Sequence, residues 1–210
     1  MPKGIFLKLN NDIIIIMKKV LWNNLMNISF IGYRCSGKTT ISKKLKELIG
    51  WQRVEIDKEI ENYFKLKIPT IINKFGWDKF RKIEKYFIKK YSIKNKIIID
   101  VGGGAILNNT NIRNLKDNGI LIFLNCSVEL IIKRLKKSFN RPALTNLKLE
   151  DETIKTLKER LPLYKNYSDY TINSGLLSIN QCTQLSAYFI REHSILLNND
   201  RQLFLKLKHA

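Results

Sequence analysis

Two patterns of hydrophobic and polar positions alternate along the chain. Five short runs rich in Ile and Val predict strands, at residues 27–32, 53–56, 96–101, 120–125 and 169–173. Segments such as 39–50 and 127–137 have apolar residues at helical spacing instead. Strands that are apolar throughout and separated by helices are typical of a parallel sheet covered on both faces. We therefore expect a three-layer α/β/α fold with a five-stranded parallel sheet, which binds ligands at the C-terminal ends of its strands.

Two segments depart from this alternation. Residues 57–92 carry only helical patterns, interrupted at Pro69, and predict a helical insertion able to fold over the sheet edge. Residues 137–150 are polar and include an Arg-Pro pair, which predicts a mobile loop over the site. We expect one domain over residues 27–195, preceded by an N-terminal extension of unknown role (1–26) and followed by a C-terminal tail (196–210). Met17 and Met26 remain alternative start residues.

Length and composition favour a single α/β domain in a reducing compartment. The 210 residues suffice for one well-buried domain, and no apolar run approaches the roughly 18 to 20 residues of a membrane helix. The basic N-terminus has only a four-residue apolar run and no cleavage site, so we expect no secretory signal. The three cysteines (Cys35, Cys126 and Cys182) lack metal-type spacing. These features predict a cytoplasmic protein without a membrane partner.

The formal charge of +20 raises the question of a nucleic-acid partner. The lysines are spread along the chain among many Ile and Asn residues, as the codon bias of an AT-rich genome would produce, and no nucleic-acid-binding signature accompanies them. We therefore expect no specific nucleic-acid partner, although a basic nucleic-acid-binding protein stays open as an alternative. The charge would still attract small anionic molecules.

The stretch GYRCSGKTT contains a phosphate-binding loop. Its pattern, Gly32-x-x-x-x-Gly37-Lys38-Thr39, lies between a predicted strand and a predicted helix, as a P-loop requires. In such loops the backbone N–H groups cradle phosphates, the lysine reaches the β- and γ-phosphates, and the hydroxyl binds Mg²⁺. We expect nucleotide contacts from Gly32, Tyr33, Arg34, Cys35, Ser36, Gly37, Lys38, Thr39 and Thr40. Cys35 lies beside a helix N-terminus and a lysine, which favours a reactive thiol; an inert small residue is the alternative.

Further motifs follow in a fixed order. Glu55 and Asp57 close the second predicted strand on the same side of an extended chain. The segments that come next are GWDKFRKIE with Arg81 and Glu84, DVGGG with Gly102, Gly103 and Gly104, NRPAL with Arg141, and ERLPLY with Arg160. Each motif alone is weak, but together their order and spacing resemble shikimate kinase, within the nucleoside-monophosphate-kinase-like P-loop fold, from about Asn27 to about Ile190.

The resemblance implies a reaction and a set of roles. Shikimate kinases transfer the γ-phosphoryl group of ATP to the 3-hydroxyl of shikimate with Mg²⁺, on the route to chorismate and aromatic amino acids, and chains of this size are usually monomers. Asp57 would orient the hydroxyl and accept its proton, while Lys38 and Arg141 would stabilise the transferring group. Residues 57–92 would bind the substrate, and residues 137–150 would be the lid. In the resemblance, Arg81 and Arg160 would bind the shikimate carboxylate, and Gly102, Gly103 and Gly104 would contact its ring. Arg134 would stack on the adenine of the nucleotide, and Arg141 would close over its phosphates.

The chain also departs from the family pattern. Glu55 stands where relatives commonly have the first Asp of an Asp-x-Asp pair, and Asp100 precedes the glycines where relatives often have a small residue. We expect Thr39, Glu55 and Asp100 as metal ligands; a strand-end carboxylate near Lys38 is the other interpretation of Asp100. Residues 173–180 lack an arginine that some relatives place near adenine. Two further alternatives are another small-molecule kinase, such as gluconate kinase, and a binding or regulatory module that has lost catalysis.

Overall fold

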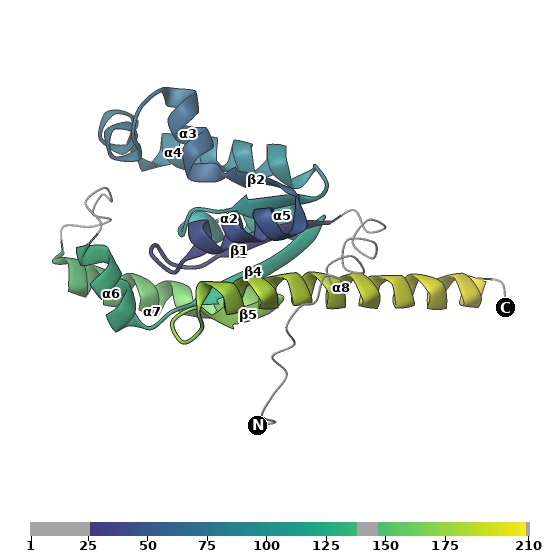
Figure 1. Ribbon diagram of the computed structural model, residues 1–210. Helices are drawn as coiled ribbons and strands as arrows, with labels where there is room; N and C mark the ends of the chain where they lie inside the picture. Colours follow the sequence, from purple (N-terminus) through teal and green to yellow (C-terminus); the bar gives the residue numbers. More distant parts are fainter. Residues whose placement is uncertain (1–25, 138–146, 209–210) are drawn as a thin grey trace.

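A five-stranded sheet forms the centre of the molecule. The computed structural model describes residues 26–137 and 147–208, with side chains as far as residue 196. All strand pairs are parallel, in the order β2-β3-β1-β4-β5 (Figure 1). The strands are β1 (Asn27–Ile31), β2 (Gln52–Glu55), β3 (Ile97–Asp100), β4 (Gly119–Asn125) and β5 (Tyr170–Asn173). The predicted five-stranded parallel sheet is confirmed, with each strand within a residue or two of its expected position.

Helices cover both faces of this sheet. They are α2 (Lys38–Ile49), α3 (Ile56–Phe64), α4 (Ile68–Ser92), α5 (Asn109–Lys116), α6 (Val128–Lys136), α7 (Leu149–Tyr167) and α8 (Ile179–Lys208), with a short 3-10 helix at Ala105–Leu107. Helices α2 and α8 pack together on one face, whereas α4, α5 and α7 pack on the other. In Figure 1, α8 runs on past the sheet towards the C-terminus, so the expected tail from residue 196 is helical as far as Lys208.

Alternate strand residues supply two separate hydrophobic cores. In β4, Ile120 and Ile122 face α2 and α8, whereas Leu121 and Phe123 face the opposite layer, and all four are buried. This follows from the two-residue period of a strand, which sends successive side chains to opposite faces. A strand buried on both faces must be apolar at every position, which explains the continuous Ile-rich runs of the sequence.

The helical insertion takes the form of α3 and α4. Pro69 lies in the first turn of α4, where its missing N–H has no partner to lose. Gly76 interrupts α4 with φ 76° and ψ 167°, a conformation that favours glycine. The helix direction changes there, and the stretch after Gly76 carries Arg81 and Glu84.

The strand register brings the predicted site segments to one edge of the sheet. Asp100 pairs with Phe30 on one side and with Glu55 on the other. The P-loop follows β1, so the carboxyl ends of β1, β2 and β3 meet there, as expected for a parallel sheet.

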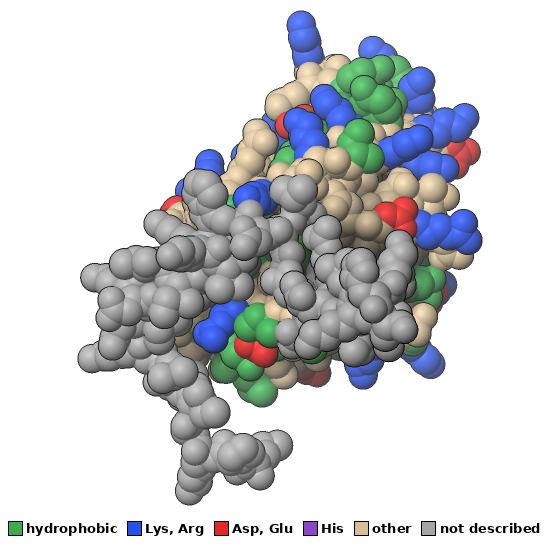
Figure 2. Space-filling model, turned by 90° about the vertical axis from the view of Figure 1, so that its right-hand side faces the viewer, with side chains coloured by type: hydrophobic (Ala, Val, Ile, Leu, Met, Phe, Trp, Pro, Cys, Tyr) green, Lys and Arg blue, Asp and Glu red, His purple; other side chains and the backbone are tan. Residues whose placement is uncertain are grey.

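Part of the lid expectation falls outside the described residues. Residues 138–146, which include Arg141, are not described, and the last two residues of the expected 137–150 loop begin α7. Within the described part of the chain no helix is long and apolar enough to cross a membrane. Figure 2 shows Lys and Arg side chains scattered over the visible face among polar and apolar ones.

Candidate active site

The P-loop is built around Gly32 and Lys38. Gly32 has φ 141°, and a Cβ there would lie 2.8 Å from the carbonyl oxygen of Leu124, so no larger residue fits. The Lys38 ammonium donates to the carbonyl oxygens of Gly32 at 2.8 Å and Tyr33 at 2.9 Å. Helix α2 begins at Lys38 without an acidic residue in its first turn. Its N-terminal N–H groups and the lysine therefore form a site suited to phosphate.

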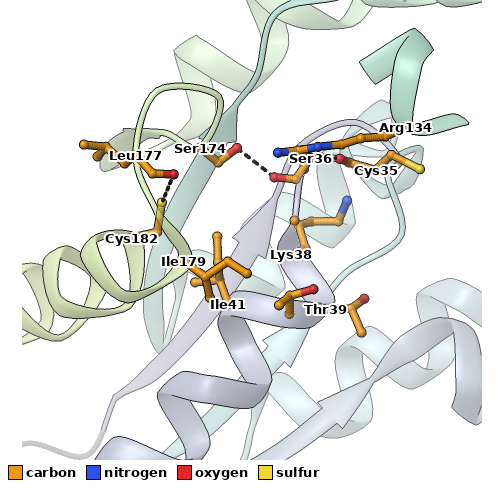
Figure 3. Close-up of a pocket in the computed structure, with 12 residues that line it drawn as sticks. Cys35, Ser36, Lys38, Thr39, Ile41, Arg134, Ser174, Leu177, Ile179 and Cys182 are labelled. Carbon is orange, nitrogen blue, oxygen red and sulfur yellow. Dashed lines mark hydrogen bonds between the residues drawn. The ribbon is translucent and has the colours of Figure 1, made fainter. Parts of the chain in front are cut away.

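A cavity of about 360 Å³ opens beside this loop. Arg134 on α6 lines it and donates to the Cys35 carbonyl oxygen at 3.0 Å. Ser174, which follows β5, also lines the cavity and donates to the Ser36 carbonyl oxygen at 2.7 Å. Figure 3 shows Arg134 on one side of the cavity and Leu177 and Ile179 on the other. The cavity thus joins the phosphate site to the region expected to hold the adenine base, with apolar side chains where some relatives place an arginine.

Two expected nucleotide contacts turn their side chains elsewhere. Tyr33 is buried in the core between the sheet and the α4–α7 layer. Arg34 forms an ion pair with Glu152 of α7, and both side chains are buried. The loop residues whose atoms line the cavity are Cys35, Ser36, Gly37, Lys38, Thr39 and Thr40. No local pattern predicts the role of Glu152, which lies in a segment with the composition of a polar surface helix.

The three glycines after β3 allow charged side chains to approach the backbone. A Cβ on Gly102 would lie 2.8 Å from Asp57 Oδ1 and 3.0 Å from Glu84 Oε1. A Cβ on Gly104 would overlap the guanidinium of Arg81. The structure therefore brings Asp57, Arg81 and Glu84 together along this segment, because no side chains fill the space.

Two residues of α7 reach the same glycine segment. Arg160 donates to the Gly103 carbonyl oxygen at 3.3 Å, and Tyr164 donates to the same oxygen at 2.5 Å. Burial raises the pKa of Tyr164 well above its usual value, so its hydroxyl remains a donor at all ordinary pH values. The role of Tyr164 was not predicted, although it belongs to the motif that contains Arg160.

Arg81 is held from several sides. Its Nη1 lies 2.6 Å from Glu84 Oε2, and its guanidinium carbon lies 5.1 Å from the ring centroids of both Trp77 and Phe80. Burial raises the pKa of Glu84 to about 7, although Arg81 opposes the shift; the nearby Asp57 adds to it. The other oxygen of Glu84 has no hydrogen-bond partner among the described residues. The site thus contains a buried carboxyl group that changes charge near neutral pH.

The expected metal ligands meet at the ends of β2 and β3. Thr39 Oγ1 donates to Asp100 Oδ2 at 2.7 Å, and Arg53 contacts both Asp100 (3.0 Å) and Glu55 (2.7 Å). Burial raises the pKa of Asp100, while Lys38, Thr39 and Arg53 all oppose this shift. No group of three His, Cys, Asp or Glu side chains in the described ranges could hold a metal alone. A hydroxyl and a carboxylate suit Mg²⁺ that keeps phosphate and water as its other ligands.

Fold and site together define a P-loop kinase that acts on a small acceptor. Residues 34–190 match the family model for shikimate kinase. The shikimate kinase of Caldicellulosiruptor saccharolyticus is 40% identical over 152 residues, which cover 72% of this chain and 88% of that protein. The Caldicellulosiruptor bescii shikimate kinase is 37% identical with the same coverage. The chain therefore belongs to the shikimate kinase family.

Solved structures agree with this assignment. A shikimate kinase from Acinetobacter baumannii in complex with shikimate is 31% identical with a TM-score of 0.75, covering 87% of this chain and 98% of that one. The Aquifex aeolicus shikimate kinase is 28% identical with a TM-score of 0.69, covering 82% and 99%. A gluconokinase from Sinorhizobium meliloti, at 10% identity and a TM-score of 0.56, shares the fold only.

Proposed function

We propose that this protein phosphorylates the 3-hydroxyl of shikimate with ATP, giving shikimate 3-phosphate and ADP. The observation that carries the proposal is the convergence of Asp57, Arg81 and Arg160 on the glycine segment next to the P-loop. Two guanidinium groups suit a carboxylate on a compact ring, because each can donate two parallel hydrogen bonds. This arrangement favours shikimate over a flexible sugar acid such as gluconate.

Each residue has a task suited to its position. Asp57 orients the acceptor hydroxyl and takes its proton, and Lys38 neutralises charge on the transferring phosphoryl group, as we also expect of Arg141. Arg134 stacks on the adenine base across the cavity from Leu177. Mg²⁺, when bound, would balance the charge of the β- and γ-phosphates, with Thr39, Glu55 and Asp100 as its candidate protein ligands.

A second part of the proposal concerns the location, oligomeric state and partners of the protein. We propose that the protein works as a cytoplasmic monomer, with shikimate as its small-molecule partner and without a specific nucleic-acid or membrane partner. The Lys and Arg side chains of the described residues in Figure 2 lie among polar and apolar ones, as expected if the basic charge reflects overall composition. Steep salt-dependent DNA binding would favour the alternative.

ADP release by the purified chain with Mg-ATP tests the proposal. Turnover should depend on shikimate and be absent with gluconate or without an acceptor. Lys38→Ala should abolish turnover, whereas Lys43→Ala, an exposed lysine on the same helix, should leave it unchanged. ADP release that gluconate stimulates as strongly as shikimate would instead support a sugar-acid kinase. Tight ATP binding without turnover on either acceptor would support the non-catalytic alternative.

A further inference from the structure

Arg53 occupies an unusual place between the expected metal ligands. It lies within β2, two residues before Glu55, and its side chain is 10% exposed. Its Nη1 donates to Glu55 Oε1 at 2.7 Å, and its Nη2 donates to Asp100 Oδ2 at 3.0 Å. One planar guanidinium therefore bridges the two carboxylates that end adjacent strands.

The α2 helix fixes Arg53 in this position. Its Nε donates to the buried Ser42 hydroxyl at 2.7 Å, and its Nη2 also lies 3.4 Å from the Thr39 carbonyl oxygen. Asp100 Oδ2 accepts from the Thr39 hydroxyl as well as from Arg53. With three of its nitrogens engaged, the guanidinium is part of the site even without a ligand, unlike a solvated surface arginine.

The charges around Asp100 and Glu55 affect how strongly the site binds a divalent cation. Asp100 and Glu55 each form an ion pair with Arg53, and Lys38 also acts on Asp100, so two cationic groups already face the two carboxyl groups. Carboxylates bind a hard divalent cation chiefly through their charge, and here that charge is already offset. Lys58 also lies 3.8 Å from Glu55, but its side chain is 66% exposed, so solvent screens it.

We infer that Arg53 is an internal counter-ion that keeps free divalent cations out of the metal site, so that the metal enters only with the nucleotide. Arg53 is thus a positioning residue: it holds the Asp100 carboxyl group beside Thr39 and offsets the charge of the two carboxylates. The phosphates of ATP then supply the negative charge that attracts the metal. This inference rests on the proposed function, because it concerns the Mg²⁺ site of the kinase.

Binding of Mn²⁺ to the purified full-length chain without nucleotide tests the inference, with free Mn²⁺ measured by electron paramagnetic resonance. Arg53→Met removes the charge but keeps an unbranched side chain, and it should bind Mn²⁺ at least about tenfold more tightly than the wild type. Arg53→Lys, which keeps the charge, and Lys58→Met, which removes a screened charge beside the same Glu55, should stay within about twofold of the wild type.

A second readout separates this role from simple packing. Arg53→Met leaves Asp100 and Glu55 facing each other, so its melting temperature should fall without metal and recover with Mn²⁺. A purely structural arginine would lower the melting temperature without recovery. Folded Arg53→Met that binds free Mn²⁺ no more tightly than the wild type would overturn the inference.

Two further measurements test the inference even if Arg53→Met does not fold. Arg53→Gln keeps a donor for Asp100 and should show the same gain in Mn²⁺ affinity. The wild-type chain should bind Mn²⁺ at least about tenfold more tightly with ADP present than without it, after correction for Mn²⁺ bound to ADP in solution; equal affinities would refute the inference. None of these assays uses shikimate, so a failure of shikimate-dependent turnover would refute the proposed function and leave the Mn²⁺ result standing.

Discussion

Replacing Gly104 by Ala would test the placement of Arg81 with a single methyl group. The backbone of Gly104 has φ −99° and ψ −4°, which any residue adopts, so the change carries no conformational penalty. The new Cβ would overlap the guanidinium of Arg81, with Cζ only 2.9 Å away. Because the guanidinium is the far end of a flexible side chain, we expect Arg81 to rotate away while the fold persists.

The size of the effect follows from the contacts that Arg81 would lose. A hydrogen bond to a charged group contributes about 1.5 to 3 kcal/mol. The Arg81 side chain is 28% exposed, and solvent screening places the loss near the lower end of that range. We therefore expect the KM for shikimate to rise about tenfold to thirtyfold, with the KM for ATP unchanged.

Steady-state kinetics of the wild type and four variants distinguish this cause from others. Arg81→Ala should raise the shikimate KM by a similar factor, and adding Gly104→Ala to it should change little, because the methyl group then has no guanidinium to displace. Gly175→Ala is the matched control, since its Cβ would meet no atom closer than 3.4 Å. A further rise in KM on adding Gly104→Ala to Arg81→Ala would show that the methyl group blocks the substrate itself, and would refute the reasoning.

Four other predictions concern the same site. Asp57→Asn should lower kcat by about a hundredfold or more with ATP binding intact, and near-normal turnover would exclude Asp57 as the base. Arg160→Ala should chiefly raise the shikimate KM; an unchanged KM would contradict the carboxylate clamp. Cys35 lines the nucleotide cavity, so Mg-ATP should protect it from alkylation, as a loss of thiol labelling would show. The pKa of Glu84 rises from 4.5 to about 7 on folding, so the folded protein binds a proton there and its stability falls as pH rises from 4.5 to 7. Glu84→Gln should therefore flatten this part of a plot of melting temperature against pH. Parallel curves for the variant and the wild type would refute the assignment.

The sequence predicts those features that depend on neighbours along the chain. The strands are visible as continuous Ile and Val runs, and the P-loop pattern needs only eight consecutive residues between a strand and a helix. Parallel strands order their carboxyl ends along one edge, so Asp57 and Asp100 could be placed near the loop without coordinates. The glycine segment next to them could be expected from its composition alone.

Other features depend on partners that are distant in the sequence. Arg53 meets Asp100 across 47 positions and Arg34 meets Glu152 across 118, and neither pair leaves a local pattern. Glu152 illustrates the difficulty, because it is buried within a helix whose N-terminal residues are mostly charged. A charged residue in such a helix is normally solvated, and only the tertiary fold reveals that this one faces inward.

Helix α7 connects the donor and acceptor halves of the site. Glu152 near its start pairs with Arg34 of the P-loop, and eight residues later, about 12 Å along the helix, Arg160 reaches the glycine segment. A buried ion pair is weak evidence for stability, because desolvation offsets much of its attraction. Its effect here is geometric, because the P-loop and the glycine segment are both attached to one helix. If they hold the phosphates and the acceptor as we propose, the distance between donor and acceptor is set before either substrate binds.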